Sequence, residues 1–147
     1  GKYLYAASDN TVAVLRIHAQ TGTLTPVAGS PYSAGKQIAS FAMSSDGKFL
    51  FASDCCTNTI QSFATNSGTT GMLTPAGSIL PAGSAPHAVA TQGHFVFVGT
   101  TTSQSNFTGS TVTGSISVYA LDSSTGILTL KGNFPTPGGP QTIIAIP

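Results

Sequence analysis

The sequence contains no glutamate and no tryptophan, and it has few charged residues of any kind. Charged residues make up 6% of the chain, against about 25% in an average soluble domain. The formal net charge is +1 and the basic residues do not cluster, so we expect no nucleic-acid partner. No apolar run reaches the roughly 18 residues that a membrane-spanning helix requires, so we also expect no transmembrane segment.

The sequence also lacks the common catalytic signatures. It has no G-x-S-x-G nucleophile motif, no H-E-x-x-H zinc motif and no phosphate-binding loop. Without glutamate, aspartate supplies all four carboxylate side chains. Asp9, Asp46 and Asp54 fall at expected turns, where aspartate commonly caps the backbone, so we interpret them as turn residues. We predict neither a metal site nor a cofactor.

What is present favours β-structure. Hydrophobic residues make up 40% of the 147 residues, which argues against disorder, and Thr, Val and aromatic residues favour strands over helices. The length fits one domain that buries about two-thirds of its unfolded surface. A polar complement of Ser, Thr and Gly is typical of exported proteins, so we expect a secreted, periplasmic or cell-surface location.

Three similar segments open successive repeats. They are GKYLYAAS at Gly1, GKFLFASD at Gly47 and GHFVFVGT at Gly93, each 46 residues after the last. Aromatic residues two positions apart in each segment would lie on one face of a strand. A second alternating run follows, then a third run after the segment TG-x-L, and a fourth run after a link rich in Pro and Gly. The fourth runs are QIASFAMS, PHAVATQ and PQTIIAIP.

Four short strands per repeat are typical of a β-propeller blade. We therefore predict an all-β fold over residues 1–147, built from β-propeller blades as three four-stranded repeats of about 46–55 residues. The repeat units are 1–46, 47–92 and 93–147. A sandwich of about twelve strands is the other all-β possibility, but it would not require regular repetition. In a blade, TG-x-L would form the turn before the third strand, with Gly at positive φ.

The repeats GKYLYAASDNTVAV…TGTLTPVAGSP and GKFLFASD…NTIQSF…TGMLTP resemble those of a known family. They look like the repeats of lactonase-type seven-bladed propellers, the 6-phosphogluconolactonase-like group, and of related YVTN-type surface repeats. The resemblance covers all three units. It implies that the fourth run of each unit is the innermost strand of the next blade. It also implies hydrolysis of a sugar lactone as one function, although a phosphorylated sugar would need basic clamps that Arg16, alone in mid-strand, does not provide.

Three blades do not close a ring of the known kind, which has four to eight blades. Three explanations are open: the chain is part of a longer propeller, copies complete a ring, or copies join head to tail into a filament. On the implied strand order, the segment from Lys2 to Ala7 lacks an inner partner, and the segment from Thr142 to Pro147 lacks its second strand. Because unpaired edges favour association, we expect self-association through these two edge strands.

His87 is our one catalytic candidate. It lies in APHAVA at the start of a fourth run, where similar lactonase-type propellers carry a Pro-x-His or Pro-Arg-His segment. Only Pro86 and His87 match this pattern, and its Arg is missing. The resemblance implies that a histidine at this position faces the central channel, where it could act as base or ligand. A packed or solvated histidine is the alternative, and we interpret His18 and His94 as structural or surface residues.

The connection between the first and second strands varies most among the repeats. It is short after Tyr5, longer in SDCCTN, and longest over residues 99–114. Insertions on one face of a repeat array often form a binding face, although drift in a tolerant loop is the alternative. The candidate binding-loop residues are Asp54, Cys55, Cys56, Ser103, Gln104 and Asn106.

Two features of these connections predict chemical modification. Cys55 and Cys56 are adjacent and form either free thiols or a strained vicinal disulfide, with a catalytic cysteine as a third reading; their spacing does not match a metal site. Asn106, Phe107 and Thr108 form an N-glycosylation acceptor triplet.

These observations favour an exported β-propeller repeat module with a binding or structural role, whose terminal strands pair between copies in a ring or filament. The alternative is a fragment of a lactonase-type hydrolase that acts on a sugar lactone. An enzyme would bring Glu, Arg and His to the channel from other blades, whereas a structural module would stay poor in charge throughout.

Overall fold

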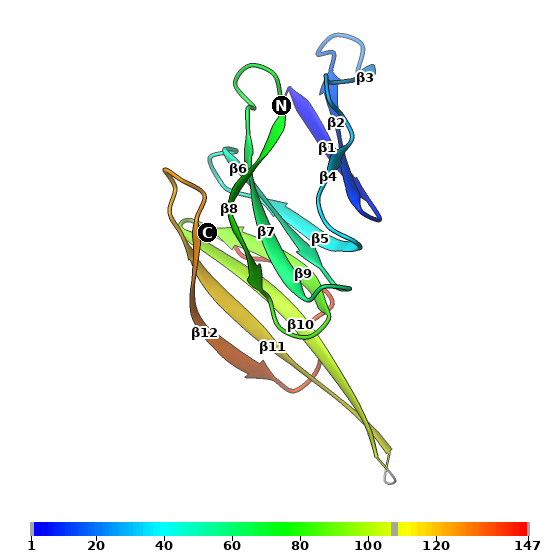
Figure 1. Ribbon diagram of the computed structural model, residues 1–147, viewed down its shortest axis with the longest axis vertical. Coiled ribbons are helices and arrows are strands. Elements are labelled where there is room, and N and C mark those ends of the chain that lie inside the picture. The colour runs from blue at the N-terminus through cyan, green and yellow to red at the C-terminus, as the bar shows by residue number, and fades with distance from the viewer. Residues whose placement is uncertain (1, 107–108, 147) are drawn as a thin grey trace.

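The structure is a computed structural model that describes residues 2–106 and 109–146, with the backbone alone described for 103–106 and 109–112. Regular structure in these residues is β-strand, and the strands form three four-stranded sheets with antiparallel pairing (Figure 1). In the part of the chain described, no helix is long and apolar enough to cross a membrane. The prediction of an all-β fold made of propeller blades is confirmed.

The three sheets follow one another along the chain. The first contains β1 (Tyr3–Ser8), β2 (Thr11–Ile17), β3 (Leu24–Pro26) and β4 (Tyr32–Ser33), and both β3 and β4 pair with β2. The second runs in the order β5 (Ile38–Met43), β6 (Phe49–Asp54), β7 (Thr59–Thr65) and β8 (Leu73–Pro81). The third runs in the order β9 (Pro86–Gln92), β10 (Phe95–Asn106), β11 (Gly109–Leu121) and β12 (Leu128–Thr136). The fourth run of one repeat thus begins the sheet of the next, as the family resemblance implied.

The first strands of neighbouring sheets lie beside each other. The Val89 backbone N–H donates to Ser40 Oγ at 3.1 Å, and Thr91 Oγ1 donates to the Met43 carbonyl at 2.7 Å. These bonds join β9 to β5 across the boundary between two sheets. Strands β5 and β9 are therefore the inner strands of their blades, and β1 begins a sheet with no such strand among the described residues.

The prediction of a strand from Thr142 to Pro147 is wrong for the residues that the structure describes. Residues 137–146 form no strand. They lie against the third sheet instead: a Cβ on Gly99 would be 2.9 Å from Pro140 Cγ and 3.1 Å from Ile143 Cδ1. The Gln92 side-chain amide also donates to the Ile146 carbonyl. A strand needs a neighbour with which to exchange backbone hydrogen bonds, and no described strand offers its edge to this segment.

The prediction of a long loop over residues 99–114 is also wrong. Strands β10 and β11 stay paired from Gly99 with Ile116 out to Asn106 with Gly109, and Figure 1 shows their ribbon projecting beyond the third sheet. The segment is rich in Thr and Ser, and we interpreted this polarity as a loop. Threonine favours strands, and this segment carries no alternation of apolar and polar residues that would reveal them.

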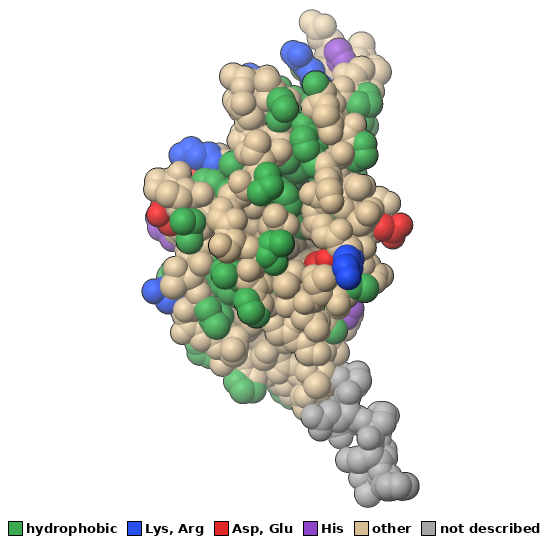
Figure 2. All heavy atoms as spheres, viewed as in Figure 1, with side chains coloured by type: hydrophobic (Ala, Val, Ile, Leu, Met, Phe, Trp, Pro, Cys, Tyr) green, Lys and Arg blue, Asp and Glu red, His purple; other side chains and the backbone are tan. Residues whose placement is uncertain are grey.

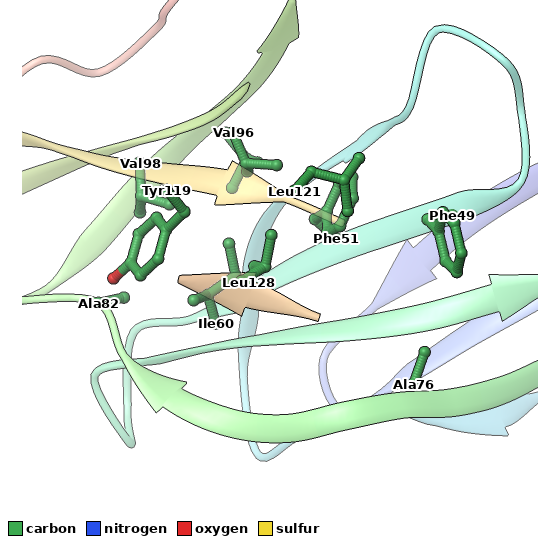
Figure 3. Packing of buried hydrophobic residues seen from close by; sticks show 11 residues of the cluster. Phe49, Phe51, Ile60, Ala76, Ala82, Val96, Val98, Tyr119, Leu121 and Leu128 are labelled. Carbon is green, nitrogen blue, oxygen red and sulfur yellow. The ribbon is translucent and has the colours of Figure 1, made fainter. Parts of the chain in front are cut away.

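Strand β6 lies between two hydrophobic cores. All six of its residues are buried. Phe49 and Phe51 face the core shared with the third sheet, whereas Leu50 and Ala52 face the core shared with the first. Figure 3 shows the former core, where Phe51 lies near side chains of the third sheet. The alternation of the strand therefore binds the three sheets together, because each face fills a different interface.

The repeated TG-x-L segment forms the same turn three times. Gly22, Gly71 and Gly126 have φ of 71°, 74° and 78°, a conformation that favours glycine. Their N–H groups donate to the carbonyls of His18, Asn66 and Asp122 at 2.8, 2.7 and 2.8 Å. The prediction of a glycine turn before the third strand is confirmed.

These turns also join neighbouring blades. A Cβ on Gly71 would be 2.5 Å from Cδ1 of Tyr3, and a Cβ on Gly126 would be 2.5 Å from Cε1 of Phe49. Each turn thus lies against the first aromatic residue of the preceding sheet. Nothing lies within 4 Å of the corresponding position on Gly22, and Phe95, the third aromatic of the series, is 46% exposed. The repeated segment is therefore an interface element as well as a turn.

Candidate functional site

The β1–β2 and β6–β7 turns meet the links between sheets at one end of the blades. The Ala34 N–H donates to the Asn10 carbonyl and the Ala82 N–H to the Asn58 carbonyl, both at 2.9 Å. The Cys55 N–H donates to the Gln37 carbonyl at 3.1 Å. We call this end, formed by turns 9–10 and 55–58 and links 34–37 and 82–85, the link face. It gathers most of the residues that the sequence nominated.

His87 occupies a β-bulge at the link-face end of inner strand β9. Ala88 pairs with Gly99 and Pro86 with Thr100, so His87 is the extra residue in the register. A bulge turns a side chain away from the regular alternation of the strand, and bulges are frequent beside active sites. The side chain is half-buried and makes no hydrogen bond with another described residue. It is therefore free to meet a ligand.

The bulge recurs one blade earlier, where it borders a hollow. In β5, Ile38 pairs with Asp54 and Ser40 with Ser53, so Ala39 holds the position that His87 holds in β9. Ala39 lines a hollow of 330 Å³ with Ala7 of β1. The same bulge position thus holds Ala39 in β5 and His87 in β9.

Asp54, a candidate binding-loop residue, is the last residue of β6 and is only 3% exposed. Its carboxylate accepts backbone N–H groups from Cys56 at 2.9 Å, from Thr57 at 3.0 Å and from Lys36. Burial raises the pKa of the Asp54 carboxyl, but these donors outweigh burial and hold the pKa below its ordinary value. Asp54 therefore ties the link to the turn and is not available as a proton acceptor.

Cys55 and Cys56 are free thiols in the structure, the first half-buried and the second exposed. The Cys56 thiol donates to Gln37 Oε1 at 2.9 Å, and the Cys55 thiol donates to the Gln37 carbonyl at 3.6 Å. Burial raises the pKa of the Cys55 thiol, and the neighbouring Cys56 raises it further. Among the described residues, neither thiol bonds a histidine or a cation, the partners that would activate a catalytic cysteine.

Two further aspartates lie in turns at the opposite end of the sheets. Asp46 accepts the Ser44 hydroxyl at 2.7 Å and the Lys48 N–H at 3.1 Å, and these bonds lower the pKa of its carboxyl. Asp122 accepts the Ser124 hydroxyl at 2.6 Å and its N–H at 2.8 Å, and these bonds lower its pKa to about 2. The interpretation of Asp46 as a turn residue is confirmed, and neither carboxylate is placed to assist His87.

Asp9 and Arg16 also stay apart from the His87 position. Asp9 lies in the β1–β2 turn with φ of 42°, and its carbonyl accepts the Ile38 N–H. Arg16 pairs with Tyr3 at the end of the first sheet that lies away from the link face. The prediction that Arg16 gives no phosphate clamp therefore agrees with its position.

Some nominated residues lie outside the described part of the chain. The side chains of Ser103, Gln104 and Asn106 are among them, although their backbone belongs to β10. Residues 107 and 108, which complete the glycosylation triplet, are outside it entirely. Both the binding role and the glycosylation of Asn106 therefore stay predictions.

The glycines in the links between sheets were not among the residues predicted from the sequence. Gly35, with φ of 144°, lies so close to Asp54 that a Cβ would be 2.5 Å from Oδ2, and a Cβ on Gly83 would be 2.9 Å from Thr100 Cγ2. A signal was present, because SAGK and PAGS stand at the same place before the first two fourth runs. We interpreted these segments only as links rich in Pro and Gly.

Comparison with known proteins places the chain in a recognisable group. A family model described as lactonase, 7-bladed beta-propeller, matches residues 1–91. None of the curated proteins compared with the chain matches it significantly. A structure of a 6-phosphogluconolactonase candidate from Bacteroides uniformis superposes with a TM-score of 0.82 at 15% identity, covering 100% of this chain and 42% of that one.

Two other solved structures give the same picture. A 6-phosphogluconolactonase candidate from Bacteroides fragilis has a TM-score of 0.77 at 22% identity, covering 97% of this chain and 38% of that one. The periplasmic gluconolactonase PpgL of Pseudomonas aeruginosa has a TM-score of 0.66 at 20% identity, covering 95% and 38%. This chain spans about two-fifths of the length of these structures, and the likeness at such identities is one of fold.

Proposed function

The chain belongs to the lactonase family of seven-bladed β-propellers, and we propose that it supplies three blades of a propeller that hydrolyses a sugar lactone. In this reaction the oxygen of water adds to the lactone carbonyl carbon, the ring C–O bond breaks, and the ring oxygen takes up a proton to give the open-chain hydroxy acid. The proposal replaces an exported assembly module as the main interpretation, because the family and the solved structures support the enzymatic alternative better.

The observation that carries the proposal is the position of His87. His87 lies in a β-bulge of inner strand β9 and is half-buried, and our proposal is that its imidazole faces the inner edge of the blades. A neutral imidazole can take a proton from the attacking water and return one to the leaving oxygen. We propose that hydrogen-bond donors from outside these three blades stabilise the oxyanion, because the Asp54 carboxylate is an acceptor and cannot donate to it.

The described residues favour a lactone without a phosphate group. A phosphate is usually held by several Arg or Lys side chains. Among the described residues, Lys36 is the one cationic side chain on the link face. Lys48 lies at the opposite end of the sheets, where it pairs with Asp46. Figure 2 shows the charged side chains as few and scattered over a largely uncharged surface. An aldonolactone such as gluconolactone is the substrate class that these blades suit.

An exported location is part of this proposal. The Ser-, Thr- and Gly-rich composition supports it, and so does the periplasmic location named for the Pseudomonas aeruginosa gluconolactonase.

The test measures hydrolysis of δ-gluconolactone by the purified protein against the spontaneous rate. We expect catalysis above background that His87→Ala lowers by about 10²-fold or more, the range of general acid–base contributions. His18→Ala is the matched control, because His18 is exposed on the first sheet and bonds only Thr25 Oγ1, at 3.3 Å. The proposal fails when the folded protein leaves the spontaneous rate unchanged, or when both variants retain full activity.

A structural role is a second candidate. It is favoured by one aromatic ring and one turn glycine that lack the partner found in the other blades. Phe95 is 46% exposed with no turn glycine described against it, and the Gly22 turn has no aromatic ring within 4 Å. These two positions are complementary in the way that Tyr3 and Gly71 are. The mass of the native particle against that of the denatured chain tests this candidate: a particle of several chains supports it, and a single chain contradicts it.

A further inference from the structure

A pocket of 330 Å³ opens between the second and third sheets at the link face. Apart from Tyr119, six hydroxyl- or amide-bearing residues line it: Ser84, Thr100, Thr102, Ser115, Ser117 and Asn133. No described lining residue is charged. This pocket is separate from the inner-edge position of His87 and has no part in the lactone reaction proposed above.

The fold repeats this pocket one blade earlier with different chemistry. The pocket between the 34–37 link and the second sheet measures 140 Å³, and Asp54, Gln61 and Lys36 are among its lining residues. Strand register makes the two pockets equivalent: Asp54 pairs with Thr59 as Thr100 pairs with Ser115. In the same way Ala52 pairs with Gln61, and Val98 with Ser117.

The enlargement therefore has an identifiable cause. Thr100 stands in the place of Asp54, and Ser117 in the place of Gln61. The shorter side chains open the space, and the exchange of Asp54 and Lys36 for uncharged residues removes the charge. The same backbone frame thus holds a small charged pocket beside one sheet and a larger neutral pocket beside the next.

The hydroxyl groups at the base of the larger pocket are fixed by hydrogen bonds. Thr100 and Ser115 share a bond of 2.8 Å between their hydroxyls, and Thr100 and Ser117 are each 3% exposed. Ser117 donates to Asn133 Oδ1 at 2.7 Å. Because this bond uses the amide oxygen of Asn133, the amide N–H groups are left to donate to a ligand.

The pocket also has an apolar wall. The Tyr119 ring is 1% exposed, and its hydroxyl donates to the Pro81 carbonyl, so the ring closes the base of the pocket; Figure 3 shows the hydroxyl directed toward the link at Ala82. Leu130 lines the pocket beside it and is 49% exposed. A neutral ligand with several hydroxyl groups and one apolar face matches this combination, and a volume near 300 Å³ suits a small ligand.

We propose that this pocket binds a neutral monosaccharide. The hydroxyl and amide groups would exchange hydrogen bonds with the sugar hydroxyls, and the exposed Leu130 would cover its C–H face. A charged sugar acid is disfavoured, because no cation lines the pocket among the described residues to replace the lost hydration of a carboxylate.

Titration of the purified protein with glucose and galactose, followed by ligand-observed NMR, tests the proposal, with gluconate as the charged probe. We expect saturable binding of at least one neutral sugar and none of gluconate. Ser117→Gln inserts the residue that fills the equivalent pocket and should weaken binding at least tenfold, whereas Gln61→Ser in the smaller pocket should leave it unchanged. Leu130→Ser, at an exposed position, should weaken binding without a change in thermal midpoint.

The variants also separate this site from the proposed catalytic position. His87→Ala should leave monosaccharide binding intact, whatever it does to lactone hydrolysis. The proposal is overturned when folded protein shows no saturable binding, which means that the pocket holds only water. It is equally overturned when binding survives both Ser117→Gln and Leu130→Ser, or is lost in His87→Ala.

Discussion

The ring of Tyr3 lies against Gly71 so closely that a Cβ at residue 71 would be 2.5 Å from its Cδ1. The Tyr3 hydroxyl donates to the Thr69 carbonyl of the same turn at 2.6 Å. The contact joins residues 68 positions apart in sequence and spans two sheets. Phe49 and Gly126 repeat it between the next pair of sheets.

The glycine of this contact should matter for two separable reasons. Gly22→Ala should lower the unfolding free energy by about 1–2 kcal/mol through the left-handed backbone alone, because nothing lies within 4 Å of a Cβ at this position. Gly126→Ala should cause the same backbone loss and also place a methyl group against the ring of Phe49. This overpacking should lower the unfolding free energy by about 1–3 kcal/mol more. Urea unfolding of the two variants measures the difference. Equal losses of unfolding free energy would show that the contact contributes nothing.

Removal of the charge at Asp54 should loosen the link to the second sheet. Asp54→Asn replaces one acceptor oxygen with an amide NH₂, which must face either the Lys36 N–H at Oδ2 or the Cys56 and Thr57 N–H groups at Oδ1, and we expect a loss of about 1–3 kcal/mol. Asp9→Asn is the control, since the Asp9 carboxylate has no hydrogen bond to a described residue and Asn tolerates its φ of 42°. Similar unfolding midpoints for the two variants would contradict the role of Asp54.

The same carboxylate should make stability fall in acid. Its folded pKa lies below the ordinary value of 3.8, so its stabilising contribution is complete above that value and is lost as pH falls through the folded pKa. Unfolding free energy of the native protein should therefore decline below about pH 4, and Asp54→Asn should decline less. Asp122, with a folded pKa of about 2, contributes in the same direction over the interval from 3.8 to about 2. Parallel acid profiles in the native protein and the Asp54→Asn variant would disprove the assignment.

The two adjacent thiols should react at different rates. Cys56 is exposed, whereas burial raises the pKa of the half-buried Cys55, and a thiol reacts through its thiolate. In alkylation with iodoacetamide at pH 8, Cys55→Ser, which keeps Cys56, should react faster than Cys56→Ser. Native protein that carries no reactive thiol before reduction would indicate the vicinal disulfide instead.

Much of the fold could be predicted from the sequence because each repeat carries the same pattern of strands and turns. The alternation in GKFLFASD and the glycine of TG-x-L each determine local structure directly, through strand periodicity and positive φ. The failures have different causes. The polar segment around Thr102 carries no apolar alternation in its sequence, and the last segment, near Ile143, is apolar enough for a strand but pairs with no described strand.

The candidate site was less accessible to sequence reasoning. His87 was nominated through resemblance, but its bulge depends on pairing between β9 and β10, which a single strand does not reveal. Asp54 could be identified as a turn residue, but not as a buried acceptor for the link. The neutral pocket required knowledge of the register between strands of one sheet, because Thr100, Ser117 and Asn133 are separated in sequence and lie on three different strands.

The contact between turn glycine and aromatic ring has a consequence for how such an array can change in length. Both halves of the contact come from fixed positions of one repeat, the ring at its third residue and the glycine in its TG-x-L segment. A repeat duplicated in frame would bring a glycine for the blade before it and a ring for the blade after it. An interface of this kind needs no new residues when a blade is gained or lost. The remaining positions, among them those lining the pockets, can then diverge from blade to blade while the register of the array is preserved.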